Sequence, residues 1–222
     1  SHLVSGIDIA LWDIRGKVLG RPLYELLGGP LRDRIALYTH PNGGPSIDGV
    51  VQSVQAIVES GHTALKTDPF PPSEEERATP YGYLSGQIDP VAENLGIDTI
   101  AAIREAVGPD VEVLIDAHGR FDVPTATRLA TRLADYRIGW FEEPVPVESH
   151  EALRLVKSQV PVPICVGERL FTRYDFLPVL RDGLADYLMP DVTWTGGVTE
   201  LRKIASLAET FHVPVSPHDA SG

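Results

Sequence analysis

Polar residues recur at a regular interval along the chain, and each of them closes a short apolar run. Asp116, Glu142, Glu168, Asp191 and His218 are separated by 26, 26, 23 and 27 residues. An interval of this length holds one strand, one crossover helix and their connections. Strands joined by helices form a parallel sheet that is buried on both faces. The spacing therefore predicts a parallel sheet that carries polar side chains at the carboxyl ends of its strands.

The apolar runs predict seven strands. They cover residues 35–40, 64–70, 111–118, 140–144, 164–168, 187–191 and 213–218. Residues 46–60 and 196–211 place their apolar side chains at helical spacing and predict two amphipathic helices. An open sheet would spread five successive strand ends along one edge, whereas a barrel brings them to a single mouth. We therefore expect an α/β fold, a TIM-type (β/α) barrel that is truncated and lacks its eighth strand.

The segments that do not follow the alternation of strands and helices predict how the chain is divided into domains and loops. Residues 1–34 show a helix, a proline-containing break, a second helix and a Gly-Gly stop, and they lead into a barrel expected over 35–222. The chain begins without methionine and stops just past a strand, so we expect it to be a piece of a longer protein. Residues 71–96 are long for a connection, which indicates either a loop over the site or a solvated acidic loop.

Charge and cysteine content limit the partners and the compartment. With 31 acidic and 19 basic residues the net charge is -12, which argues against nucleic acid or an anionic membrane as a partner. The chain has one cysteine, so it has no internal disulfide framework and fits a reducing compartment such as the cytoplasm. It has no apolar run long enough to span a membrane.

Three of the strand-end residues predict a metal site. Asp116, Glu142 and Glu168 come from three successive strands, and carboxylates brought together repel one another and lose hydration. A divalent cation removes this conflict, and oxygen ligands favour Mg²⁺ or Mn²⁺ over zinc. The alternative is that each acid caps the following helix or pairs with an arginine.

Five motifs, taken in order, carry a resemblance to a known family. They are "LIDAHGRF", "WFEEPVP", "VGERL", "MPDVTWTGGVTE" and "VSPH". Together they resemble the enolase superfamily and, within it, the mandelate racemase subgroup. The resemblance implies that Asp116, Glu142 and Glu168 bind Mg²⁺ and that His218 and Asp191 form a dyad that removes the proton α to a carboxylate. It also implies an N-terminal capping domain, to which residues 1–34 would link, and we expect a homo-oligomer.

His118 predicts the outcome of the reaction. It lies two residues beyond Asp116, so on a regular strand it shares the face of that residue. An imidazole there would protonate a β-hydroxyl as it leaves, and "DAHGR" resembles the acid-sugar dehydratases of the galactonate type. The resemblance implies a lyase that converts an aldonate, a small sugar acid, to its 2-keto-3-deoxy product. A structural histidine bonded to a neighbouring loop is the alternative.

The segment after the second predicted strand departs from the racemase pattern. Racemases of the subgroup carry Lys-x-Lys there, whereas this chain has Lys66, Thr67 and Asp68, which disfavours racemisation by two bases. We expect Lys66, Asp68 and Arg169 to bind substrate, although an ion pair between Lys66 and Asp68 is an alternative. Three other functions stay open: a racemase or epimerase, a mannonate-type dehydratase, and a non-catalytic barrel that binds sugar acids.

Overall fold

The computed structural model describes residues 2–44, 46–70 and 85–218, and the chain divides into two compact units. One unit is Ala36–Cys165, and the other combines Ser1–Ile35 with Val166–Gly222. In the described residues, five strands form a sheet in the order β1-β2-β3-β4-β5, which is also their order in the sequence. Successive crossovers through helices produce this order. Among the described residues, no helix is both long enough and apolar enough to cross a lipid bilayer.

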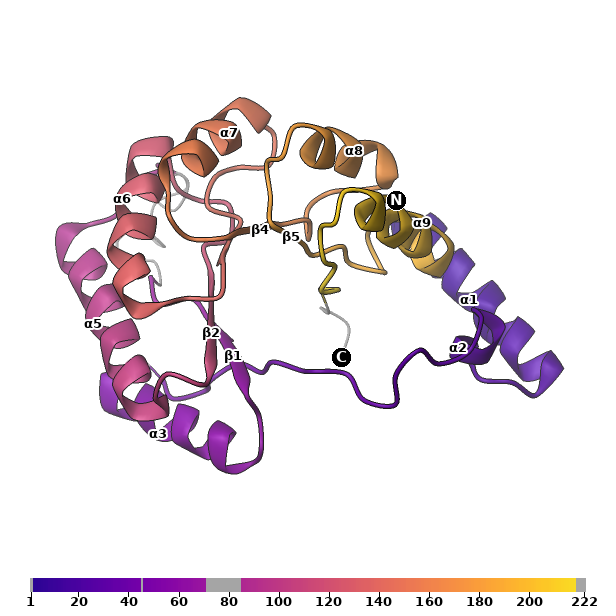
Figure 1. Ribbon diagram of the computed structural model, residues 1–222, viewed down its shortest axis with the longest axis horizontal. Helices are drawn as coiled ribbons and strands as arrows, with labels where there is room; N and C mark the ends of the chain where they lie inside the picture. The colour runs from indigo at the N-terminus through magenta and orange to yellow at the C-terminus, as the bar shows by residue number, and fades with distance from the viewer. Residues whose placement is uncertain (1, 45, 71–84, 219–222) are drawn as a thin grey trace. The chain divides into compact units, whose positions relative to one another are not determined.

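In the described residues of the unit Ala36–Cys165, three complete parallel strands have helices beside them (Figure 1). The strands are β1 (Ala64–Thr67), β2 (Glu112–Asp116) and β3 (Phe141–Glu142). The helices are α3 (Ile47–Glu59), α5 (Pro90–Val107), α6 (Val123–Leu133) with the 3₁₀ turn η2 (Ala134–Tyr136), and α7 (His150–Gln159). The register pairs Thr67 with Ile115 and Asp116 with Glu142, so the carboxyl ends of the strands lie level with one another.

Local sequence signals set where these helices begin. Ser46, Asp89, Asp122 and Ser149 each accept a hydrogen bond from a backbone N–H in the first turn of the helix that follows. A side-chain cap of this kind stabilises a helix by about 1 kcal/mol. The caps therefore fix where each of these helices starts, and α6 and α7 start seven and eight residues after the strands that precede them.

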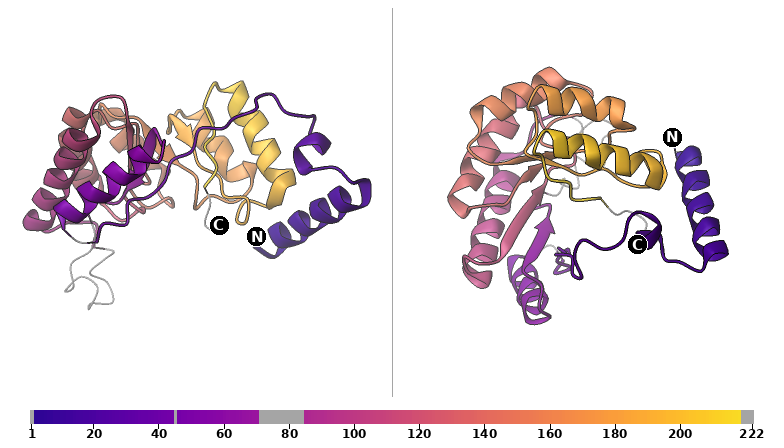
Figure 2. Two further views of the ribbon diagram at one scale, coloured as in Figure 1. Left: turned by 90° about the horizontal axis from the view of Figure 1, so that it is seen from below. Right: turned by 45° about the vertical axis from the view of Figure 1, so that its right-hand side comes forward.

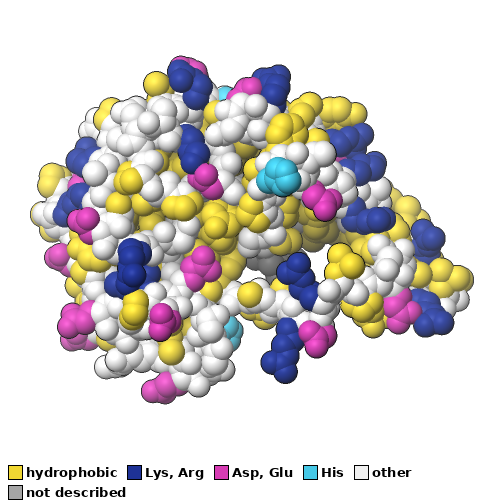
Figure 3. All heavy atoms as spheres, viewed as in Figure 1, with side chains coloured by type: hydrophobic (Ala, Val, Ile, Leu, Met, Phe, Trp, Pro, Cys, Tyr) yellow, Lys and Arg dark blue, Asp and Glu magenta, His cyan; other side chains and the backbone are white. Residues whose placement is uncertain are grey.

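Strand β4 (Ile164–Val166) begins in the unit Ala36–Cys165, and its last residue opens the second unit. The described residues of the second unit also form strand β5 (Tyr187–Leu188) and helices α1 (His2–Leu19), α2 (Leu23–Leu26), α8 (Arg173–Arg181) and α9 (Gly197–Thr210). Helix α1 lies beside α9 (Figure 2), and Trp12 Nε1 donates a 2.8 Å hydrogen bond to Thr199 Oγ1. Helix α1 also exposes apolar side chains, including Leu3, Leu11 and Val18, and Figure 3 shows apolar side chains on the surface of this helix.

The prediction of seven strands was wrong for the first and the last of them. Residues 35–40 contribute a single bridge, between Thr39 and Leu65, and residues 213–218 contribute two bridges, from Val215 and His218. Pro214 and Pro217 have no N–H to donate, which interrupts the ladder in the last segment. Five predicted strands remain, in the predicted order and parallel.

The predicted loop over residues 71–96 was also wrong at its end. Helix α5 begins at Pro90, and the side chain of Asp89 caps it by accepting from the N–H groups of Val91 and Ala92. Proline is favoured in the first turn of a helix, where its missing N–H costs nothing. Residues 71–84 lie outside the described part of the chain.

Candidate functional site

Asp116 and Glu142 close two neighbouring strands, β2 and β3, and are paired in register. Both are buried, Asp116 at 5% exposure and Glu142 at 0%. Lys66, on β1, extends its ammonium group between them. Lys66 Nζ lies 2.9 and 3.0 Å from the two carboxylate oxygens of Glu142 and 3.3 Å from Asp116 Oδ2. The two predicted metal ligands of this unit therefore share one lysine. The alternative of an ion pair between Lys66 and Asp68 does not account for the position of Lys66.

The surroundings of Lys66 keep it charged. Burial alone disfavours the ammonium form, but the attraction of Glu142 and Asp116 outweighs this effect and raises the pKa of Lys66. The ammonium also lies 5.3 Å from the centre of the Tyr38 ring, a cation–π contact. The charge of Lys66 is therefore a fixed part of the site.

Trp140 is a site residue that the sequence analysis did not predict. Its Nε1 donates a 3.1 Å hydrogen bond to Glu142 Oε2, and the indole is almost fully buried. A signal for this contact was present, because residues two apart on a strand share a face and "WFE" places Trp140 two residues before Glu142. Glu142 is thus held by Trp140 and Lys66 together.

His118 lies beside Asp116 as expected, but it is not part of the strand that was predicted to place it there. Strand β2 ends at Asp116, and His118 adopts a left-handed backbone with φ 56°. Its N–H donates to Asp116 Oδ1 at 2.9 Å. The ring lies with Nδ1 3.2 Å from Asp68 Oδ2 and Nε2 3.5 Å from Asp116 Oδ2. Glu143, which follows β3, has φ 42°, so two strands are followed by left-handed residues other than glycine.

The second unit brings together Glu168, Asp191 and His218. His218 Nδ1 lies 2.8 Å from Asp191 Oδ2, and His218 Nε2 lies 3.1 Å from Glu168 Oε2. Asp191 also accepts from the N–H and the hydroxyl of Thr193, both at 2.6 Å. Burial opposes the charge on Asp191, but these hydrogen bonds and the one from His218 outweigh it and lower the pKa of Asp191. The carboxylate is therefore held ionised beside the imidazole.

Arg169 follows Glu168 in the loop after β4. Because the strand ends at Val166, Arg169 is free of strand alternation, and its Nε donates to Glu168 Oε1 at 3.1 Å. Its side chain is 38% exposed. Arg169 thus turns toward the acidic side chain that precedes it.

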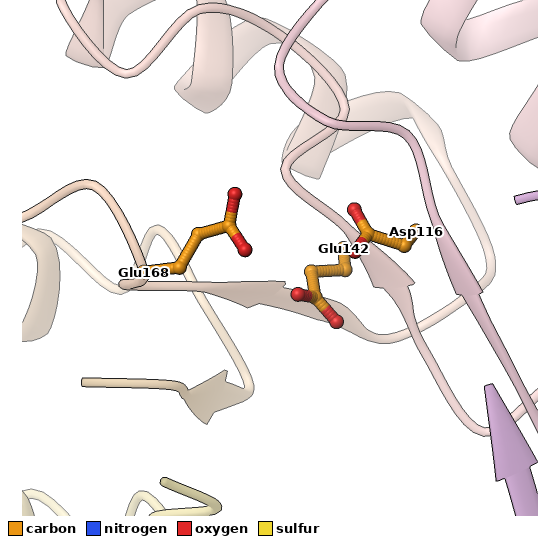
Figure 4. A group of neighbouring side chains, drawn as sticks. All are labelled: Asp116, Glu142 and Glu168. Carbon is orange, nitrogen blue, oxygen red and sulfur yellow. The ribbon is translucent and has the colours of Figure 1, made fainter. Parts of the chain in front are cut away.

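The nine predicted site residues form one group in each unit. The unit Ala36–Cys165 groups Lys66, Asp68, Asp116, His118 and Glu142, and the other unit groups Glu168, Arg169, Asp191 and His218. Figure 4 shows the three predicted metal ligands, each at or just beyond the carboxyl end of its strand. Each group holds buried carboxylates and one histidine–aspartate pair.

Parallel strands that end in buried carboxylates and histidine–aspartate pairs define a class of α/β proteins that carry their functional site at the carboxyl ends of the strands. Within this class the chain belongs to the enolase superfamily, because residues 49–222 match the family described as "Enolase C-terminal domain-like". Residues 3–28 match the N-terminal domain of the mandelate racemase / muconate lactonizing enzyme family. The predicted superfamily, subgroup and TIM-type fold class are confirmed.

Individual relatives are similar over nearly the whole chain. The chain is 41% identical to D-gluconate dehydratase of Thermoproteus tenax, covering 99% of this chain and 42% of the relative. It is 39% identical to D-galactonate dehydratase of Pectobacterium atrosepticum, covering 97% of this chain and 53% of the relative. A solved mandelate racemase/muconate lactonizing enzyme-like protein from Rubrobacter xylanophilus superposes with a TM-score of 0.90 at 38% identity, covering 100% of this chain and 59% of that one. The chain therefore spans about half the length of these relatives.

Proposed function

We propose that the chain carries the catalytic residues of a Mg²⁺-dependent sugar-acid dehydratase. The reaction removes the proton α to the carboxylate of an aldonate, eliminates the β-hydroxyl and gives a 2-keto-3-deoxy acid. The observation that carries the proposal is the presence of two histidine–aspartate pairs at strand ends, His218 with Asp191 and His118 with Asp68. An elimination needs one group to accept a proton and another to donate one. The names of the gluconate and galactonate dehydratases support an aldonate as substrate.

The buried carboxylates fit a divalent cation. Asp116 and Glu142 carry two negative charges against the single positive charge of Lys66, and all three are buried. An uncompensated buried charge is costly, so a cation that adds to Lys66 stabilises this arrangement. We propose Glu168 as the third ligand, because β4 lies next to β3 in the sheet, with Cys165 paired to Glu142, and Glu168 follows β4. When bound, Mg²⁺ or Mn²⁺ would supply a Lewis acid to the substrate carboxylate.

His218 is proposed as the base. Asp191 holds Nδ1 of its ring at 2.8 Å, which leaves Nε2 as the nitrogen that faces Glu168. The ionised Asp191 then stabilises the imidazolium that forms when His218 accepts the α-proton.

His118 is proposed as the acid that protonates the departing hydroxyl. Its ring is 40% exposed, so a substrate has access to it, and Nε2 is directed toward Asp116. Lys66 and the partly exposed Arg169 are proposed to attract the substrate carboxylate by charge. Asp68 stands where the subgroup's racemases carry a second lysine, which favours elimination over two-base racemisation.

The experiment separates the two proton transfers in the full-length protein. D-gluconate and D-galactonate are incubated with Mg²⁺ in D₂O, and NMR follows deuterium at the α-carbon alongside the 2-keto product. We expect His218→Asn to lose both signals. We expect His118→Asn to keep exchange, provided elimination is stepwise, and to lose about 10²–10⁴-fold in dehydration.

Three outcomes would contradict the proposal. Exchange with recovery of an epimer and no keto acid would indicate a racemase or epimerase. Neither exchange nor product with any aldonate tested would indicate a binding protein. Unchanged product formation by His118→Asn would remove its role as acid.

A further inference from the structure

Asp68 makes contacts that differ from those of a substrate ligand. It follows β1 directly and lies level with Asp116, since Thr67 pairs with Ile115. Its Oδ2 lies 3.2 Å from His118 Nδ1. Its Oδ1 accepts a hydrogen bond of 2.8 Å from the N–H of Phe70. Both carboxylate oxygens are therefore engaged by the protein itself.

A buried arginine supports the same carboxylate. Arg120 is 5% exposed, and its Nη2 lies 3.4 Å from Asp68 Oδ1. Its guanidinium lies 4.8 Å from the centre of the Phe121 ring, which limits its movement. Arg120 and the backbone of Phe70 thus hold Asp68 from one side, and His118 lies on the other.

Both nitrogens of the His118 ring face carboxylates. Nδ1 faces Asp68, and Nε2 lies 3.5 Å from Asp116 Oδ2, on the side of the buried carboxylates. The hydrogen bond made by one imidazole nitrogen determines the role of the other. Without Asp68, the ring could rotate about its bond to the backbone or exchange its Nδ1 and Nε2 tautomers.

His218, in the other unit, has the same arrangement of atoms around its ring. His218 presents Nδ1 to Asp191 Oδ2 and Nε2 to Glu168 Oε2. His118 presents Nδ1 to Asp68 Oδ2 and Nε2 to Asp116 Oδ2. Each unit thus orients one imidazole by a carboxylate at Nδ1 and directs its Nε2 to a proposed metal ligand.

We infer that Asp68 is a positioning residue for His118: it accepts a hydrogen bond from Nδ1–H, so that Nε2 is the nitrogen that carries the transferable proton toward the leaving hydroxyl. This inference rests on the proposed role of His118 as acid. It replaces the expectation that Asp68 binds the sugar. It also gives a reason for an aspartate at the position where the subgroup's racemases place a second lysine, because an ammonium group there could not accept this hydrogen bond.

The test compares Asp68→Ala, His118→Asn and the double variant in the full-length protein. Asp68→Ala should lower kcat for dehydration by about 10²-fold, as expected for a misplaced catalytic group, while KM, Mg²⁺ affinity and α-proton exchange stay near wild type. The double variant should lose no more than His118→Asn alone. A rise in KM with kcat retained, or losses that multiply in the double variant, would overturn the inference.

A second measurement does not depend on turnover. Nitrogen-15 NMR of the His118 ring, assigned with the His118→Asn variant, should show that Nδ1 keeps its proton in the wild type both before and after the Nε2 proton is lost, whereas the neutral ring of Asp68→Asn should show a mixture of the Nδ1–H and Nε2–H tautomers. Ring signals unchanged in Asp68→Asn would overturn the inference. Should the protein dehydrate no aldonate, the proposed function fails, and the ring signals still decide whether Asp68 orients His118.

Discussion

Replacing Lys66 with methionine should destabilise the metal-free protein strongly and the Mg²⁺-loaded protein much less. Nζ lies 2.9 Å from Glu142 Oε1 and 3.3 Å from Asp116 Oδ2. With an effective dielectric constant of about 20, the two attractions amount to roughly 6 and 5 kcal/mol. Desolvation of the three buried charges offsets most of this sum. We therefore expect a net loss of about 3–5 kcal/mol in free energy of unfolding, the usual cost of breaking a buried ion pair from one side.

Urea unfolding of the full-length protein, in EDTA and in saturating Mg²⁺, measures this difference. The cation should restore a larger part of the stability in the variant than in the wild type, because it neutralises carboxylates that have lost their lysine. Lys17→Met is the matched control. Lys17 pairs with Asp13 at 2.6 Å but is 75% exposed, and surface ion pairs contribute at most about 1 kcal/mol.

Two results would contradict a charge-balancing role for Lys66. A loss below about 1 kcal/mol in EDTA would mean that Lys66 does not balance the buried carboxylates. An equal loss in EDTA and in Mg²⁺ would mean that the side chain stabilises the protein through packing instead of charge.

Two further predictions concern residues outside the reacting groups. Trp140→Phe removes the N–H that holds Glu142, so calorimetry should show Mg²⁺ affinity reduced about 10–100-fold, whereas Trp12→Phe, which also loses an indole hydrogen bond, should bind as the wild type does. Glu93→Gln should cost about 1–3 kcal/mol at pH 7. Burial opposes the charge of Glu93, but two arginines outweigh it and lower its pKa, so its contribution is complete above the pKa of the unfolded glutamate and is lost as pH falls through the folded pKa. Denaturation curves should therefore converge for wild type and Glu93→Gln in acid, and a constant difference from pH 7 to pH 3 would contradict this.

The sequence predicted the features that depend on local pattern. Period and polarity placed Asp116 and Glu142 at neighbouring strand ends, where the register pairs them. The prolines at 214 and 217 were visible in the sequence, but the prediction of a strand over 213–218 did not take their missing N–H groups into account. Elements with a regular period were therefore predictable, and their ends were less so.

The contacts between strands were beyond the reach of sequence pattern. The position of Lys66 between two carboxylates depends on the register of β1 against β2, which no local feature specifies. The meeting of His118 with Asp68 depends on a left-handed backbone just after β2, where strand alternation no longer applies. The types of residue at the site were predictable, whereas their pairing required the fold.

The left-handed residues after β2 and β3 lower the stability of the fold, although one of them, His118, is needed for the proposed reaction. His118 and Glu143 hold a backbone conformation that glycine adopts freely and that costs other residues about 1–2 kcal/mol. A library of variants selected only for survival on heating should accumulate glycine at these two positions. A library selected for the proposed dehydration of a sugar acid should keep the imidazole at 118 in spite of its cost. The sequences from the two selections would therefore differ just after the ends of these strands and would stay alike in the buried core.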